Sequence, residues 1–249
     1  MLWCTSYASE YLEKEFKLDT ESLSNFEEYL NAFLKEIISL KIWSKHIKEK
    51  KLLLYDQDQY LEEIISNLNQ SLVLGAIGFR IPAYMMIRRS LENILSFIFY
   101  MEHPVEYMMK ENESNKKNDY KISDYKEYLK SYPYHVKFGE TQLESIKRLI
   151  QRITTAWTEQ YRELSNFVHA TNSDYLELGS YLENIVPSND TLLSLHNQVQ
   201  IFGTLVNALN IIFFNDIYIA MDKREKSFIR VSMSEEFEIK RGLTNSIGI

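Results

Sequence analysis

The sequence predicts an all-α protein, and two observations lead to that fold class. The 249-residue chain contains 7 glycines and 4 prolines, where average usage would give roughly 17 and 12. Sheets and tight turns use these two residues for special backbone conformations, whereas helix interiors exclude them. In addition, every long segment repeats its apolar residues with the helical period of about 3.6. We therefore expect an up-down bundle of four or five long helices with an inserted polar loop.

The start of the chain carries the pattern of two helices. Residues 5–18 form a short, acidic, amphipathic segment. Ser24 and Glu27 then have the spacing of a capping box, with a hydroxyl before the helix and a carboxylate three residues later. The helix that follows is expected to run to about residue 51. Its apolar positions recur at helical spacing: Phe26, Leu30, Phe33, Leu34, Ile37, Ile38 and Leu40.

Two further helices and an insertion are expected next. A third helix begins near Asp56, and Pro82 either kinks it or occupies the first position of a fourth helix. Residues 103–138 are rich in Lys, Asn, Glu, Ser and Tyr and lack aliphatic periodicity. We expect this stretch to be a solvated insertion with one short helix around Asp124 to Lys130.

Two long helices are expected in the second half of the chain. Thr141 and Glu144 form a second capping-box pattern, which opens a helix running to about His169. After a polar break, another apolar helix is expected from Thr191 to Met221.

The expected organisation is one bundle with a flanking segment at each end. The tail is polar and is expected to fray, with at most one short helix around Ser234 to Arg241. The divisions are a helical segment at 1–55 that packs on the bundle, the bundle itself at 56–225 with the insertion 103–138, and the polar C-terminal tail at 226–249.

The charge balance restricts the surfaces that could bind nucleic acid. The chain has 28 basic and 35 acidic residues, for a net charge of −7. The chain as a whole therefore lacks the basic net charge that marks many nucleic-acid-binding domains. Any RNA-binding surface of this chain must therefore be a local patch.

The chain has the features expected of a cytoplasmic protein. Cys4 is the sole cysteine, so an intrachain disulfide and a cysteine-based zinc site are excluded. Glu10, Glu13 and Glu15 interrupt the N-terminal segment before an apolar signal core could form. The most apolar stretches are interrupted by charged residues or asparagines, and we expect no membrane-spanning helix.

Several kinds of site are absent from the sequence. There is no G-x-x-x-x-G-K-[ST] phosphate loop, no H-E-x-x-H zinc motif and no G-x-S-x-G elbow. Di-iron bundles use Glu-x-x-His pairs, yet none of the five histidines has Glu three residues before it. We therefore expect no metal and no cofactor. The residues three positions before the five histidines are Trp43, Tyr100, Tyr132, Asn166 and Leu193.

One polar pattern stands out in the long helix that ends near residue 169. Arg162 and His169 are seven residues apart, so the helix turns about 700° between them and returns to within about 20° of its start. Asn166 lies four residues after Arg162 and three before His169, and Ser165 lies at the edge of the same face. These four side chains are called the polar ridge below.

The arginine-to-histidine spacing within a helical bundle resembles the HEPN superfamily, whose hallmark is an arginine followed by a histidine on one helix. The phrase YRELSNFVH is similar to a branch of bacterial abortive-infection and uncharacterised HEPN proteins. The earlier phrase from Ile87 to Glu92, IRRSLE, is similar to the Arg-Ser-Leu-x-Glu helix of that branch. The resemblance covers residues 60–220, apart from the insertion.

The resemblance implies a metal-independent endoribonuclease that acts as a toxin or antiphage defence effector. Histidine transfers protons near neutral pH, so His169 would serve as acid or base. Arg162 would hold the phosphate as its charge grows, while Asn166 and Ser165 complete the catalytic set. HEPN proteins typically place two copies of the site at a homodimer interface, and the expected partners are a second copy, RNA and a cognate antitoxin or regulatory protein.

Three further residues are candidates for substrate binding. Arg88 and Glu92 lie four apart in an apolar helix, where charges need partners. They form either a simple helix ion pair or a polar pocket facing the ridge. Arg152, together with its basic neighbours, forms either a track leading to Arg162 or an ordinary solvated helix face.

Other interpretations of the motif stay open. Arg162 could instead pair with Glu159, Glu163 or Asp174, and His169 could stabilise the helix C-terminus as a cation. Many HEPN nucleases have Asn or another polar residue after the arginine, whereas this chain has Glu163. The alternative function is a non-catalytic helical module that binds a partner protein or a ligand. In some toxin pairs an antitoxin modifies a tyrosine near the motif, for which Tyr175 is the downstream candidate.

Overall fold

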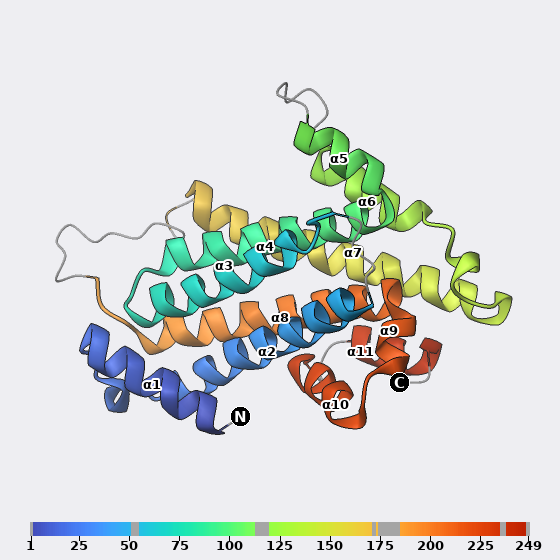
Figure 1. Ribbon diagram of the computed structural model, residues 1–249. Helices are drawn as coiled ribbons and strands as arrows, with labels where there is room; N and C mark the ends of the chain where they lie inside the picture. Colours follow the sequence, from blue (N-terminus) through green and yellow to red (C-terminus); the bar gives the residue numbers. More distant parts are fainter. Residues whose placement is uncertain are drawn as a thin grey trace.

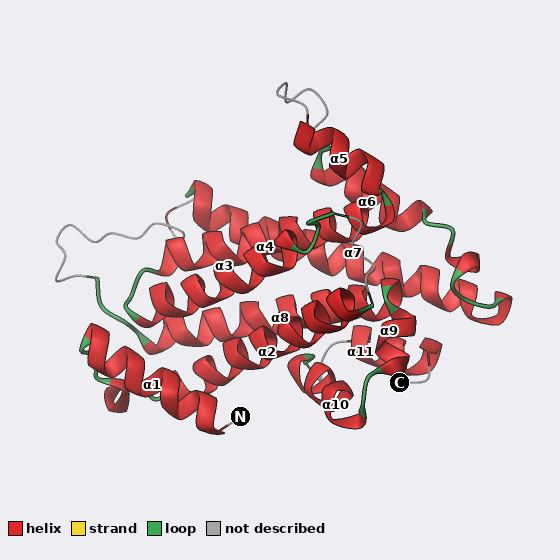
Figure 2. Cartoon of the chain, in the orientation of Figure 1, coloured by secondary structure: helices red, strands yellow, loops and turns green. Residues whose placement is uncertain are grey.

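The structure is a computed structural model that describes residues 2–50, 55–112, 120–170, 173, 185–234 and 238–247. Within these ranges the regular elements are all helices, joined by loops and turns, and no strand occurs (Figure 2). The predicted all-α class is therefore confirmed for the described part of the chain.

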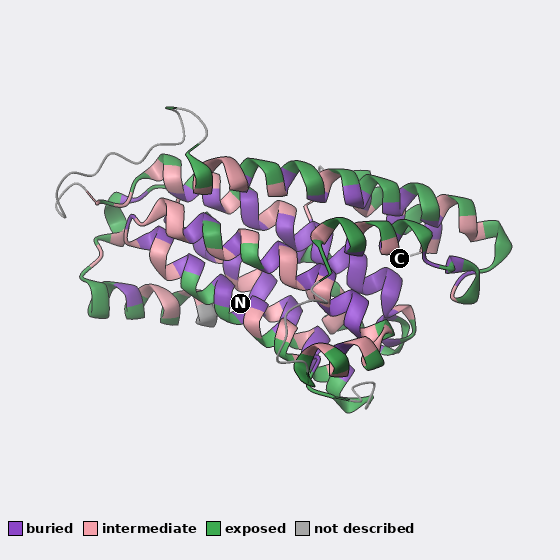
Figure 3. Ribbon diagram, turned by 90° about the horizontal axis from the view of Figure 1, so that it is seen from above, coloured by how far each residue is buried: buried purple, intermediate pink, exposed green. Residues whose placement is uncertain are grey.

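Five long helices form the centre of the molecule. They lie side by side (Figure 1), and α8 contacts each of the other four. From Phe202 to Phe213 every residue of α8 is buried, so this half of the helix lies inside the core. Figure 3 shows buried residues concentrated between the long helices and exposed residues on the outside. The five are α2 (Phe26–Glu49), α3 (Gln59–Ala76), α4 (Arg80–Glu102), α7 (Glu140–His169) and α8 (Asn189–Phe213).

Shorter helices surround this centre. The helix α1 lies at one end of the bundle, and α9, α10 and α11 gather at the other end (Figure 1). Their bounds are α1 (Leu2–Phe16), α5 (Pro104–Asn112), α6 (Ile122–Ser131), α9 (Asn215–Ala220), α10 (Lys223–Ser232) and α11 (Glu238–Ile247), with 3₁₀ turns at Thr20–Ser22 and Tyr134–Val136.

The C-terminal tail is expected to fray, but its described residues form two packed helices. The helix α10 packs on α2 and α8, and α11 packs on α7 and α8. Ile229, Ile239 and Leu243 are each at most 3% exposed. Burial of a few apolar residues at helical spacing is enough to hold a short helix on the bundle, even though the segment is polar overall.

The described parts of the insertion, residues 103–112 and 120–138, are also more structured than expected. The short helix around Asp124 is confirmed as α6, but α5 precedes it, and tyrosines of both helices are buried against α4. Tyr107 packs edge-on against Tyr100, and Tyr125 donates a hydrogen bond to the Tyr100 hydroxyl over 3.3 Å. Tyrosine supplies a large apolar surface together with a polar group. The spacing of aliphatic residues alone therefore does not reveal that tyrosines of this segment are part of the core.

Neither predicted capping box forms. The helix α2 begins at Phe26 and α7 at Glu140, and at neither start does a cap side chain accept a helix N–H. A capping box is present instead at the start of α10, where Asp222 accepts from the N–H of Glu225 over 2.7 Å. The cap motif is short, so packing decides which candidate helix start is used.

The turn between α3 and α4 depends on a glycine. Gly78 has φ +94°, and a Cβ atom there would lie 2.7 Å from the carbonyl carbon of Val186. Glycine avoids both the backbone strain and this contact. Pro82 lies in the first turn of α4, where proline is tolerated.

The predicted helix from Thr191 to Met221 is divided in two. Its first part is α8, which ends at Phe213, and its second part is the short α9. Among the described residues no helix is both long enough and apolar enough to span a membrane.

A buried polar cluster joins α2, α8 and α10. The Asn207 amide donates to Glu36 over 3.2 Å and to Ser232 over 2.8 Å, and it accepts from Trp43 over 2.9 Å. Gly203 lies against the Glu36 carboxyl group, so close that a Cβ atom there would collide with it. Burial raises the pKa of Glu36 to about 8, although hydrogen bonds from Asn207 and Ser232 oppose the shift.

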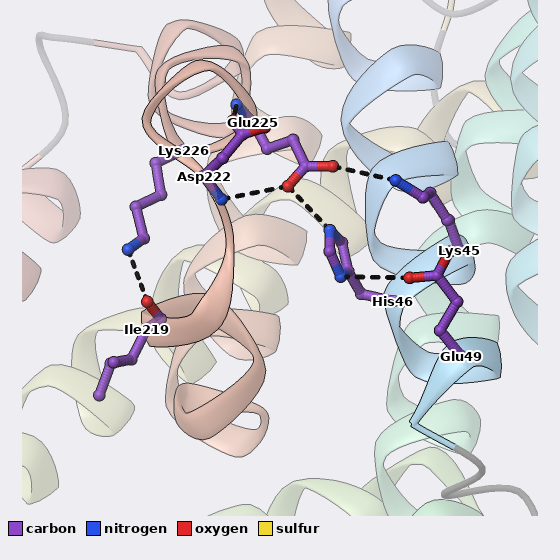
Figure 4. A network of polar contacts seen from close by, with 7 residues as sticks. All are labelled: Lys45, His46, Glu49, Ile219, Asp222, Glu225 and Lys226. Carbon is purple, nitrogen blue, oxygen red and sulfur yellow. Dashed lines mark hydrogen bonds and ion pairs between the residues drawn. The ribbon is translucent and has the colours of Figure 1, made fainter.

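A second polar network holds α10 on the outside of α2 (Figure 4). Glu225 contacts the His46 imidazole at 2.9 Å and accepts from the Lys45 ammonium over 3.3 Å. Burial opposes ionisation of Glu225, but the hydrogen bonds from His46, the Asp222 backbone and Lys45 outweigh it and lower its pKa. This carboxylate therefore contributes most to stability when it is ionised.

Candidate functional site

The helix α7 presents the polar ridge. Its inner face is fixed to the bundle by Trp157, whose Nε1 donates to the Leu91 carbonyl over 3.0 Å, and by Gln160, which donates to the Gln198 carbonyl over 2.6 Å. The helix ends at His169, as predicted, because Ala170 turns into the left-handed region with φ +46°. The N–H of Ala170 closes the last turn on the Asn166 carbonyl.

The outer face of α7 leaves two side chains of the polar ridge exposed. Arg162 and His169 are exposed, whereas Ser165 and Asn166 are half-buried. Seven residues of helix separate Arg162 from His169 by roughly 10 Å along the axis. The two therefore lie on one accessible face, with Asn166 between them.

Arg162 does not form the ion pairs that a purely structural role would suggest. Among the described residues no carboxylate lies within ion-pair distance of its guanidinium, including those of Glu159 and Glu163. Asp174, the third candidate partner, lies outside the described residues. Glu163 accepts a hydrogen bond from Gln198 of α8 over 2.8 Å. Within the described part of the chain, the Arg162 guanidinium is therefore exposed and has no carboxylate partner.

Ser165 belongs to a different cluster from Arg162. Arg88 of α4 donates from Nε to the Ser165 hydroxyl over 3.1 Å and from Nη2 to the Tyr161 hydroxyl. Glu92 pairs with Arg88 at 3.3 Å and accepts from Tyr161 over 2.9 Å. These four residues are called the Arg88 cluster below.

The Arg88 cluster contains the helix ion pair that was one of the two interpretations made from the sequence. Arg88 and Glu92 do form a helix ion pair, and they also reach across to α7 at the edge of the ridge. Tyr161 was missed as a member, although its position one residue before Arg162 was visible in the motif. Burial and the hydrogen bond to Glu92 raise the pKa of Tyr161, while Arg88 opposes the shift. The tyrosine is therefore a neutral donor at physiological pH.

We expect Arg88→Ala to destabilise the protein by roughly 1 kcal/mol, because Glu92 and Tyr161 lose a partially buried donor. The Arg88 side chain is 25% exposed. The adjacent Arg89, whose side chain is 60% exposed and pairs with Glu63, supplies the matched control. Arg89→Ala should change stability by less than about 0.5 kcal/mol. Urea unfolding followed by circular dichroism measures both, and equal losses would contradict the structural role of Arg88.

Arg152 lies apart from the Arg88 cluster. Its guanidinium pairs with Glu238 of α11 at 3.4 Å. It lines a depression on the α11 side of α7, together with Arg148 and Ile239. The structure therefore does not bring the three predicted substrate-binding residues together.

A groove of about 620 Å³ runs between α6 and α7, and Arg162 lies in its wall. Lys126 of α6 reaches across it and donates to the Thr158 hydroxyl over 3.0 Å. Sequence reasoning missed Lys126 and Lys130 because their short helix belongs to the stretch expected to be a solvated insertion, away from the bundle. The groove, called the α6–α7 groove below, is lined by Lys126, Lys130, Lys147, Ile150, Gln151, Thr154, Thr155, Thr158, Glu159 and Arg162.

The described residues contain no group of three or more His, Cys, Asp or Glu side chains placed to hold a metal ion. No family model matches the chain, and no match was found among curated proteins or solved structures.

Proposed function

We propose that this chain is a HEPN-like, metal-independent endoribonuclease that acts as a toxin or antiphage effector. The observation that supports this most is Arg162, an exposed arginine without a carboxylate partner among the described residues, in the wall of a basic groove. The exposed His169 lies on the same face of α7. The proposal includes the up-down arrangement of the long helices that is expected from the sequence.

The proposed reaction uses the RNA as its own nucleophile. The 2′-oxygen attacks phosphorus, its proton passes to a base, and the bond to the 5′-oxygen breaks as that oxygen receives a proton. The products are a 2′,3′-cyclic phosphate and a free 5′-hydroxyl. His169 has the residue type for either proton transfer at neutral pH. The Arg162 guanidinium would bind the phosphoryl oxygens, whose negative charge increases in the transition state.

The direct test is cleavage of total cellular RNA by the purified full-length protein in excess EDTA. We expect cyclic phosphate ends from the wild-type protein and no products from His169→Ala. Expression of the wild-type chain should also arrest cell growth, and the variant should not. Activity that EDTA abolishes and Mg²⁺ restores would contradict the metal-independent mechanism.

We expect a homodimer in which the His169 side chains lie close to the twofold axis. One ridge supplies a single histidine, whereas the reaction needs a base and an acid, and a second copy would supply the other group. Sedimentation equilibrium at micromolar concentration measures the association. A monomer at that concentration would contradict the shared site.

A non-catalytic module that binds a partner protein or a ligand is the second candidate. It is favoured by Glu163, which follows Arg162 directly and is held by Gln198, and by the net charge of −7. Harmless overexpression without RNA cleavage would favour this function. Tyr175, the residue considered for modification by an antitoxin, lies outside the described residues.

A further inference from the structure

We propose that the α6–α7 groove binds the sugar-phosphate backbone of single-stranded RNA and leads it to Arg162. This inference rests on the proposed function for the identity of the ligand. It adds a binding surface, contributed largely by α6, that lies outside the arginine-histidine motif.

The charge of the groove points to a polyanionic ligand. Lys126, Lys130, Lys147 and Arg162 line it, and Glu159 is the sole acidic residue among its lining residues. The chain as a whole carries a net charge of −7. A concentration of positive charge against this background is the local patch that binding to RNA requires.

The cations of the groove are largely free of carboxylates. Among the described residues, Lys147 pairs with Glu144 at 3.3 Å, but no carboxylate lies within ion-pair distance of Lys126, Lys130 or Arg162. An ordinary solvent-exposed helix face usually forms ion pairs between opposite charges three or four residues apart. Here three of the four lining cations form no ion pair with a described carboxylate, which favours an anionic ligand.

The length and the uncharged lining residues favour an extended chain of phosphates. Lys147 and Arg162 are fifteen residues apart on α7, which corresponds to roughly 22 Å of helix. Several consecutive phosphates of an extended strand fit along this length. Gln151 and Thr155 are exposed between the two cations and offer hydrogen-bond donors along the same wall.

The groove lacks the features that would read bases. None of its lining residues is aromatic. Trp157 of α7 is only 2% exposed, and the Lys126 ammonium lies 5.6 Å from the centre of its ring. Proteins that bind the bases of single strands stack them on exposed aromatic rings. The groove is therefore suited to the backbone, and we expect binding with little dependence on base sequence.

Equilibrium binding of fluorescein-labelled oligouridylate to the full-length protein tests the inference. All variants carry His169→Ala to prevent cleavage, and fluorescence anisotropy is recorded over a range of salt concentrations. Lys126→Gln with Lys130→Gln should weaken binding about tenfold and reduce the slope of log K against log salt by about 1.4. The matched control, Lys41→Gln with Lys223→Gln, removes the same charge from exposed positions on α2 and α10 and should bind like the parent.

Each outcome decides between defined possibilities. Equal affinities for the groove variant and the control, or no binding by the parent, would overturn the inference. Competition by ATP or inorganic triphosphate as effective as unlabelled oligouridylate would also overturn it, because the groove would then be a small-ligand site. Groove-dependent binding of RNA without cleavage by the wild-type protein would refute the proposed catalysis while retaining the binding surface.

Discussion

Replacing His169 with alanine is expected to slow RNA cleavage by about 10²–10⁴-fold, the usual loss for a general acid or base. Arg162→Ala should slow it by about 10²–10³-fold, because a donor to the developing charge is removed. Both side chains are exposed, so neither change opens a core cavity of the kind that costs ~2–5 kcal/mol. Single-turnover rates with a labelled RNA and thermal unfolding midpoints measure the two effects separately.

Two further variants sharpen this prediction. Arg162→Lys should restore little activity, because an ammonium group cannot reproduce the two-pronged contact of a guanidinium. The double variant should be scarcely slower than the slower single variant, since groups that act as a unit are not additive. Arg148→Ala is the control, because Arg148 is an exposed arginine of the same helix that lines the depression on the α11 side.

The opposite pattern would assign the ridge to structure. If the Arg162→Ala and His169→Ala variants are both unfolded, the two side chains stabilise the C-terminal end of α7. If a well-folded His169→Ala remains fully active, the histidine has no catalytic role. Either result would favour the non-catalytic binding module over the ribonuclease.

The second large effect concerns the stability of the protein at different pH values. Glu36 is 1% exposed, and burial raises its pKa from 4.5 to about 8. Since the folded state holds this proton more tightly than the unfolded state, its contribution to stability is fully present below pH 4.5. That contribution is lost as the pH rises through about 8.

Glu36→Gln should remove this pH dependence, because an amide cannot ionise. The wild-type protein should lose up to about 1.4 kcal/mol per pH unit relative to the variant across this window. At pH 5 the two proteins should have similar stability, and at pH 8 the variant should be more stable by a few kcal/mol. Urea unfolding at several pH values measures the difference between the two curves.

The control for this prediction is Glu27→Gln, which changes an exposed glutamate on the same helix. Its curve should stay parallel to that of the wild-type protein. If Glu36→Gln also gives a parallel curve, then Glu36 is ionised in the folded protein. Its neighbours in the buried cluster would then stabilise the charge about as strongly as burial opposes it, and the pKa of Glu36 would stay near its ordinary value.

The sequence by itself determined the helices that matter most for the candidate site. Helical periodicity is a local property, so the apolar spacing placed α7 and its end at His169 correctly. The same periodicity put Arg162 and His169 on one face, because that relation depends only on the turn per residue. The helical character of α2, α3, α4 and α8 followed from the same local pattern.

The tertiary structure decided which local signals were used. The cap patterns at Ser24 and Thr141 were not formed, whereas the start of α10 was capped. A cap contributes only about 1 kcal/mol, which is less than the burial of a single large side chain. The positions of helix starts therefore follow the packing of the neighbouring helices.

Only the tertiary structure could show the surroundings of the ridge. Lys126 lies 36 residues before Arg162 in the sequence, and the two line one groove because α6 folds back along α7. Arg88 contacts Tyr161 and Ser165 instead of Arg162 for the same reason, since the packing of α4 on α7 selects its partners. Spacing along one helix fixes which side chains share a face, but contacts between distant segments depend on how the complete core is packed.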